Sequence, residues 1–312
     1  MLSSVKAENL LTRAVPDTLT GRIIQFPLMR ILIAVLFLTP VTLLHLVFEQ
    51  HVKPGIPDGF RAISVNIETI IGFILMILAY RLYAKYVEMR KAHELSIKTA
   101  PREFLTGLTI GGGLMVLIVI ILALPGCYRI TGFNSDGMVL IKDLLPLAMA
   151  AFVEEILFRV IIFKLTEELL GSRIAIIIQA GLFGLAHLGN ENATLWAATA
   201  LAIEAGIILA AAYMYTRRIW LAFGIHLGWN YFQAYVFGIT TSGETLEGLI
   251  MPEIAGPEWL TGGNFGVETS VVAVLLCLTA GIILFRMAVA NKQFVLSARK
   301  RKILNTVQPE NG

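Results

Sequence analysis

Two adjacent glutamates and an arginine stand inside an otherwise apolar run of the chain. Glu154 and Glu155 are followed by Arg159, and the flanking residues are almost all aliphatic or aromatic. A charged side chain at mid-bilayer costs roughly 2.5–3.5 kcal/mol even on the mildest scale, so such groups face a protein interior and usually serve function. Residues four apart share a helix face, so we expect Glu155 to pair with Arg159 and Glu154 to be left over.

Two later apolar stretches carry one histidine each at a similar spacing. His187 lies four residues after Phe183, and His226 lies four residues before Asn230. A single histidine near a helix end is most often a hydrogen-bonded interface group. The polar groups of the three segments are nevertheless all predicted near mid-membrane depth, and burying each group separately in hydrocarbon would cost free energy. We therefore expect them to line one shared, hydrated cavity, where they can form hydrogen bonds with each other and with water.

These residue types are sufficient for hydrolysis. A glutamate beside a histidine can hold and deprotonate a water molecule, and a second histidine with an asparagine can donate hydrogen bonds to a developing oxyanion. Glu154, His187, His226 and Asn230 are therefore the candidate catalytic residues for peptide-bond cleavage without a covalent intermediate. No serine or cysteine accompanies the motifs, which disfavours nucleophilic catalysis; Cys127 is expected in an outer loop and Cys277 on the last span.

The elements that must position these groups are transmembrane helices. Of the 312 residues, 56% are hydrophobic and 15% are charged, and the mean hydropathy is +0.75. Soluble domains carry about 25% charged residues. We therefore predict an integral membrane protein with an all-α fold, a polytopic transmembrane bundle of about eight helices with the active site in an intramembrane cavity. The net charge of +3 reflects basic cytoplasmic loops and does not imply nucleic acid as a partner.

Windows of about 20 apolar residues identify the predicted spans. They lie near residues 28–48, 62–84, 104–125, 139–164, 174–190, 193–216, 219–238 and 268–290. The chain is thereby divided into a polar N-terminal segment (1–22), a transmembrane domain (23–290) with a catalytic core at about 140–238, and a basic cytoplasmic tail (291–312). Glycines four apart, Gly107 with Gly111 and Gly224 with Gly228, are expected to let helices approach closely.

Lysine and arginine are concentrated in every second connection between the predicted spans. The segment 239–266, on the other side, has neither of them and carries four glutamates. Because basic loops stay in the cytoplasm, we predict that both termini are cytoplasmic, in the plasma membrane if the source is prokaryotic. The basic residues concerned are Lys6, Arg13, Arg22 and Arg30; Arg81, Lys85, Arg90, Lys91, Lys98 and Arg102; Lys164 and Arg173; Arg217 and Arg218; and Lys292, Arg299, Lys300, Arg301 and Lys302.

The motifs Glu154-Glu155-x-x-x-Arg159, Phe183-x-x-x-His187 and His226-x-x-x-Asn230 occur in this order over about 140–238. Together they resemble the signature of the CPBP family of intramembrane endopeptidases, the type II CAAX prenyl protease and bacteriocin-processing (Abi-like) type. The resemblance implies that Glu154 and His187 activate the water and that His226 and Asn230 form the oxyanion site. It also implies that Glu155 and Arg159 support the architecture or the substrate C-terminus, with Phe183 as a further supporting residue.

The resemblance also implies the partners, which are the lipid bilayer and a membrane-associated protein or peptide substrate. A prenylated CAAX tail is the eukaryotic case, and leader-peptide or bacteriocin-linked processing the prokaryotic one. We predict no cofactor and no metal. The alternative is Zn²⁺ held by Glu154, His187 and His226. Against zinc, the two-histidine helix motif of zincins is absent and Asn230 is not a usual zinc ligand.

Two functions of other classes use similar residues. Buried glutamate, histidine and arginine also form the proton relays of coupled transporters, which predicts a polar path through two related halves, whereas the polar groups here cluster in the second half. His187 and His226 could ligate a haem, beside which two adjacent carboxylates would be unusual. Glu204, a lone acid in the span 193–216, is expected to face the cavity as a partner of Arg159 or a histidine, with a proton-relay or substrate-gating role as the alternative.

Overall fold

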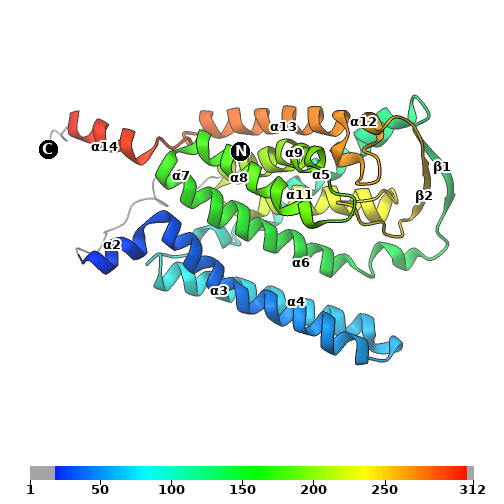
Figure 1. Ribbon diagram of the computed structural model, residues 1–312, viewed down its shortest axis with the longest axis horizontal. Helices are drawn as coiled ribbons and strands as arrows, with labels where there is room; N and C mark the ends of the chain where they lie inside the picture. The colour runs from blue at the N-terminus through cyan, green and yellow to red at the C-terminus, as the bar shows by residue number, and fades with distance from the viewer. Residues whose placement is uncertain (1–17, 308–312) are drawn as a thin grey trace.

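The chain folds into a bundle of long helices that lie roughly along one axis of the molecule (Figure 1). The computed structural model describes residues 18–307. Lys6, Arg13 and the other residues before 18 in the predicted N-terminal segment, and residues 308–312 of the predicted tail, therefore lie outside the described residues. The prediction of an all-α polytopic bundle is confirmed.

Six helical segments in the described part of the chain are long and apolar enough to cross a membrane. Each of them corresponds to one of the eight predicted spans. They are formed by α3 (Pro27–Val47) with η1 (Phe48–Val52) and η2 (Lys53–Gly55); α4 (Asp58–Tyr86); α5 (Ala100–Ala123); α8 (Ser172–Ala186) with η6 (His187–Gly189); α9 (Leu195–Leu201), η7 (Ala202–Gly206) and α10 (Ile207–Thr216); and α13 (Val271–Ala290).

The other two predicted spans are also helical, but they are less apolar because they carry the polar motifs. The first runs without a break through α6 (Leu144–Glu155), η5 (Ile156–Phe163) and α7 (Lys164–Leu170), and the second through α11 (Ile219–Tyr231) and η8 (Phe232–Val236). The predicted bounds 139–164 of the first were wrong at both ends. Residues 137–140 form the separate turn η4 (Gly137–Leu140), and the helix continues to Gly171, whose φ of +85° ends it.

A two-stranded antiparallel sheet closes one end of the bundle. β1 (Tyr128–Phe133) pairs with β2 (Ile250–Ile254), with a bulge between Ile130 and Gly132. The sheet lies at the right-hand end in Figure 1, opposite α7 and α14. The sheet was not predicted, because its two short strands lie far apart in the chain and only the folded protein brings them together. The remaining short elements are α2 (Leu19–Gln25), η3 (His93–Leu95), α12 (Glu258–Thr261), η9 (Val267–Thr269) and α14 (Ala298–Val307).

Close packing of α5 against α11 fixes the rotation of the helix that carries His226. A Cβ on Gly107 would lie 2.4 Å from the carbonyl oxygen of Leu221, and one on Gly228 would lie 2.6 Å from that of Leu108. The predicted glycine contacts are therefore confirmed, and the two glycine pairs pack against each other. With this face of α11 held against α5, His226 points to the other side of its helix.

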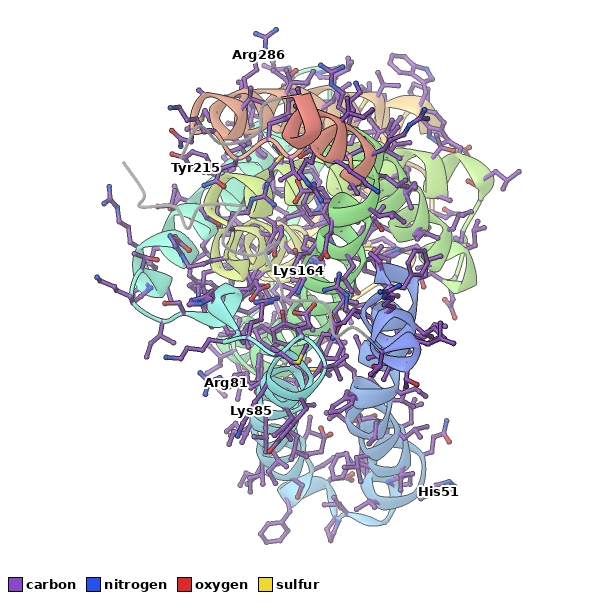
Figure 2. All side chains as sticks on the ribbon, turned by 90° about the vertical axis from the view of Figure 1, so that its left-hand side faces the viewer. His51, Arg81, Lys85, Lys164, Tyr215 and Arg286 are labelled. Carbon is purple, nitrogen blue, oxygen red and sulfur yellow. The ribbon has the colours of Figure 1, made fainter. Side chains whose placement is uncertain are left out.

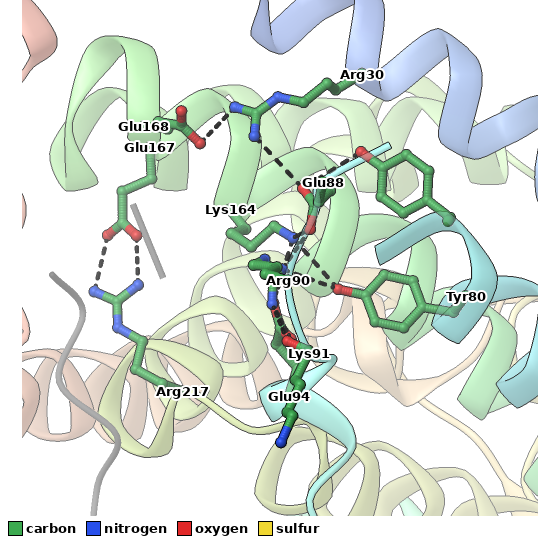
Figure 3. Close-up of polar contacts among 11 residues, drawn as sticks. Arg30, Tyr80, Glu88, Arg90, Lys91, Glu94, Lys164, Glu167, Glu168 and Arg217 are labelled. Atoms are coloured by element: carbon green, nitrogen blue, oxygen red, sulfur yellow. Dashed lines mark hydrogen bonds and ion pairs between the residues drawn. The ribbon is translucent and has the colours of Figure 1, made fainter. Parts of the chain in front are cut away.

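A network of buried ion pairs joins the helices at the end of the bundle opposite the sheet (Figure 3). Glu88 is fully buried and lies 2.7 Å from Lys164, 2.5 Å from Arg90 and 3.6 Å from Arg30. Glu167 pairs with Arg217 in the same region. Nearby, Arg218 donates to Glu103 at 2.8 Å, which ties the start of α11 to α5.

This network changes the interpretation of part of the basic pattern. Arg30, Lys164, Arg217 and Arg218 were predicted to lie in cytoplasmic connections, but all four are buried in ion pairs. The exposed basic residues still gather at this end, which Figure 2 views directly.

The network stabilises the ionised form of Glu94, which lies in η3. Burial opposes the ionisation of Glu94, but Arg90 and Lys164 beside it lower the pKa of this carboxyl to about 2. The stability that ionised Glu94 contributes is therefore present above pH 4–5, where the unfolded carboxyl is also ionised, and is lost only as the pH falls toward 2.

Glu88→Ala is expected to destabilise the protein by about 3–5 kcal/mol, because it leaves buried cations without their shared carboxylate. Unfolding in mixed detergent micelles, followed by loss of helical circular dichroism, measures the change. Glu49→Ala is the matched control, since it breaks a partly exposed pair with Lys53 that is worth at most about 0.5 kcal/mol. Equal effects of the two substitutions would contradict a structural role of the network.

Candidate active site

The predicted catalytic residues line one cavity inside the bundle. Its volume is about 220 Å³, and its walls include Glu154, His187, His226 and Asn230. These residues come from α6, the end of α8 and α11. The structure thus places the three sequence motifs around a common space, as the shared-cavity hypothesis requires.

Glu154 lies close to both histidines but forms no direct hydrogen bond with either of them. Its Oε2 atom lies 3.9 Å from Nε2 of His187 and 3.9 Å from Nε2 of His226. This oxygen is buried and has no hydrogen-bond partner in the part of the chain that the structure describes, although a third of the Glu154 side chain is exposed to the cavity. A gap of 3.9 Å is too long for a direct hydrogen bond, but a water molecule about 2.8 Å from each atom would bridge it.

Both imidazole rings are held through their other nitrogen. Nδ1 of His187 lies 2.8 Å from the carbonyl oxygen of Phe183, and Nδ1 of His226 lies 2.9 Å from Oε1 of Glu155. Since a carbonyl and a carboxylate only accept, each Nδ1 must carry a proton and donate it. In the neutral rings, Nε2 therefore presents a lone pair toward Glu154.

The supporting residues form a layer behind the cavity. Arg159 lies 3.0 Å from Glu155, so the predicted ion pair is confirmed, and its guanidinium lies 4.4 Å from the centre of the Phe183 ring. The same ring lies 4.7 Å from that of His187 and 6.2 Å from that of His226. Phe183 thus connects the arginine to both histidines.

The structure sharpens the division between the two glutamates. Glu155 is fully buried and holds both Arg159 and His226, so its role includes the orientation of an imidazole, which the helix geometry did not predict. Arg159 is fully buried as well and does not line the cavity, so contact with a substrate C-terminus is not supported. It donates instead to the Ala205 carbonyl, which belongs to the π-helical turn η7.

Three further side chains face the cavity. Glu204 lines it, as expected for the lone acid of its span, and shares a hydrogen bond with Cys277. Cys277 lies on the last span, as predicted, and it also lines the cavity. Glu268, in η9, was missed, although an acid at the start of a predicted span could have drawn attention to it.

Glu268 forms hydrogen bonds that hold a loop against the cavity. Residues 238–246, here named the cap segment, contribute Thr241, Ser242 and Glu244 to the cavity wall. Glu268 accepts a hydrogen bond of 2.5 Å from the Ser242 backbone and one of 2.6 Å from Gln233, which also donates to Thr240. The cap segment is therefore held by a carboxylate that is almost completely buried.

Glu268→Gln is expected to change how stability depends on pH. Burial raises the pKa of Glu268 to about 7, against the opposing effect of its hydrogen bonds with Gln233 and Ser242. Because this exceeds the unfolded value of about 4.3, the wild-type protein should lose up to about 3 kcal/mol of stability as the pH rises from about 4 to 7. Thermal unfolding at pH 5 and pH 8 measures this, and the loss should be absent in Glu268→Gln. The same pH dependence in both proteins would contradict the assignment.

Comparison with known protein families agrees with the motifs. Residues 137–232 match the family model described as type II CAAX prenyl endopeptidase Rce1-like. The matched region contains all three motifs and confirms the predicted resemblance to CPBP family intramembrane endopeptidases. The match and the spanning helices together support an integral membrane protease. No curated protein and no solved structure gave a significant match.

Proposed function

We propose that the chain is an intramembrane endopeptidase that hydrolyses a peptide bond of a membrane-associated substrate with a water activated by Glu154 and His187. The observation that carries this proposal is the position of Glu154 Oε2, which is buried without a hydrogen bond from any described residue and lies 3.9 Å from both imidazole Nε2 atoms. Such a carboxylate can accept a proton from a water held between it and a histidine.

The proposed reaction is hydrolysis of a peptide bond with Glu154 as the general base. Glu154 takes a proton as the water oxygen attacks the substrate carbonyl carbon, and the C=O bond becomes an oxyanion. Asn230 and His226 donate hydrogen bonds to that oxyanion. The proton on Glu154 then passes to the departing nitrogen, the C–N bond breaks, and a carboxyl group and an amine are released.

Glu155 has a specific part in this scheme. His226 already donates from Nδ1 to Glu155, so donation from Nε2 to the oxyanion requires the doubly protonated ring. The carboxylate of Glu155, 2.9 Å away, stabilises that positive charge. A buried glutamate at this position thus supports both the orientation and the charge of His226.

The second candidate is the zinc-dependent version of the same reaction. The anchoring of each Nδ1 by a carbonyl or carboxylate is also the arrangement typical of zinc-binding histidines. Glu154, His187 and His226 would hold the ion, which would supply a bound water of lowered pKa. With bonds of about 2.0–2.2 Å the ligand atoms of a tetrahedral site lie about 3.3 Å apart, so the observed 3.9 Å would have to shorten by roughly half an ångström.

Chelation separates the two versions. Purified protein in lipid nanodiscs, treated with excess EDTA or 1,10-phenanthroline and then freed of chelator, is expected to keep its full rate of peptide cleavage, because no step of the proposed reaction uses a metal. The rate is measured with a fluorogenic peptide mixture before and after treatment. Activity that disappears on chelation and returns on addition of Zn²⁺ would establish the zinc version instead.

A further inference from the structure

The two ends of the bundle carry opposite charge. The end that bears α2, α7 and α14, which lies on the left in Figure 1 and faces the viewer in Figure 2, exposes most of the lysine and arginine side chains. The end that bears β1, β2 and α12 exposes mostly acids. The exposed basic residues include Arg81, Lys85, Lys91, Lys98, Arg102, Arg173, Arg286, Lys292, Arg299, Lys300 and Lys302; the exposed acids include Asp136, Glu191, Glu244, Glu247, Glu253 and Glu258.

The catalytic cavity lies far from the basic end. Helix α8 starts at Ser172, whose backbone donates to Val295 next to α14, and His187 follows its 15 residues. A helix rises 1.5 Å per residue, so His187 is roughly 20 Å from that end. The continuous helix α6–η5–α7 places Glu154 at a similar distance from Leu170. Since the hydrocarbon core is about 30 Å thick, the cavity occupies the half nearer the acidic end.

The part of the cavity wall that reaches the surface includes residues at the acidic end. Asn190 and Glu244 are exposed and line the cavity together with Ser242, and Asn190 donates to the carbonyl of Ser242 at 3.0 Å, which joins the end of α8 to the cap segment. None of the lining residues belongs to the buried ion network at the basic end. Among the described residues, the cavity walls carry four glutamates and no lysine or arginine, so no permanent positive charge in them would pair with a terminal carboxylate.

By the positive-inside rule the basic end faces the cytoplasm. We propose that the cavity opens to the opposite side of the membrane and that its substrate is an extracytoplasmic segment next to the membrane anchor of another polypeptide, cut at an internal peptide bond. A cytoplasmic prenylated tail would meet the wrong end of the bundle. This inference rests on the proposed endopeptidase function and specifies its substrate class.

Accessibility of single introduced cysteines tests the orientation. Glu247→Cys lies in the acidic segment, with a side chain that is 76% exposed, and Lys300→Cys lies on α14 at the basic end. In sealed vesicles with the extracytoplasmic face outward, a membrane-impermeant maleimide is expected to label Glu247→Cys at once and Lys300→Cys only after detergent is added. The wild-type protein is the control, because Cys127 and Cys277 are both buried. Labelling in the reverse order would overturn the proposal.

The location of the cleaved bonds tests the substrate class. Peptide termini are compared between cells that produce the wild-type protein and cells that produce Glu154→Gln at the same level. New termini are expected in extracytoplasmic segments close to membrane anchors. New termini confined to cytoplasmic segments would overturn the inference while the endopeptidase function stands, and identical termini in both cells would overturn the function together with the inference.

Discussion

Glu154→Gln is expected to lower the rate of peptide cleavage by about 10³-fold while the protein still folds. The amide has nearly the same size as the carboxyl group but cannot accept the proton of the attacking water, and general-base catalysis is typically worth 10²–10⁴-fold. Within residues 18–307, no ion pair with arginine or lysine holds Glu154, so its substitution leaves the buried pair of Glu155 and Arg159 intact. The kcat of the purified variant and its thermal unfolding temperature measure the two effects separately.

Glu247→Gln is the matched control for this experiment. Glu247 lies in the acidic segment 239–266, but its side chain is 76% exposed and it is not one of the residues that line the cavity. We expect this variant to keep a rate within about threefold of wild type, as surface changes of this kind usually have small effects. A Glu154→Gln protein that retained more than a tenth of the wild-type rate would contradict the role given to this carboxylate.

Glu155→Leu is expected to destabilise the protein by about 3–5 kcal/mol and to reduce activity as well. Arg159 would remain fully buried without the carboxylate that pairs with it, which is the costly way to break a buried pair. His226 would in addition lose the acceptor of its Nδ1 proton. The free energy of unfolding in mixed micelles and the kcat of the folded fraction are the quantities to measure.

The double variant Glu155→Leu with Arg159→Met distinguishes these two effects. It replaces both charges by apolar groups, and such replacements of buried ion pairs are often neutral for stability. Stability should therefore largely return, while the rate stays low because His226 still lacks its acceptor. A double variant that recovered activity together with stability would show that Glu155 supports the architecture alone.

Much of the site could be predicted from the sequence because its signals are local. The pair of Glu155 and Arg159 follows from their spacing of four residues on one helix, and it is present at 3.0 Å. The wide apolar windows likewise identify most of the helices, since length and hydropathy alone decide whether a segment can span a membrane. The separation of Glu154 from this ion pair followed from the same helix geometry.

The remaining features depend on contacts between distant parts of the chain. Glu88 pairs with Arg30 and Lys164, which come from two other helices. No local sequence pattern indicates that these residues come together. Glu268 reaches the cavity only because the loop before α13 folds back over it. The anchoring of His226 by Glu155 is also a contact between helices, so the spacing within each motif could not indicate it.

The side of the membrane on which the cavity lies was inferred from a sequence pattern together with a feature of the fold. The distribution of basic residues is visible in the sequence, whereas the depth of the site depends on where α8 begins and ends. Ser172 at the basic end and His187 at the cavity fix that depth along a single helix. The distribution of charge is therefore used to infer both the membrane topology and the side of the membrane on which the substrate is cut.

Hydrolysis in H₂¹⁸O in the presence of hydroxylamine tests the central claim most directly. Wild-type protein in lipid nanodiscs is incubated with a mixture of peptides, and the new C-termini are analysed by mass spectrometry. Attack by an activated water predicts that every new C-terminus is a carboxyl group with one ¹⁸O atom and that none is a hydroxamate. Hydroxamate products would show that a covalent acyl intermediate had been intercepted, which would contradict the mechanism assigned to Glu154 and His187.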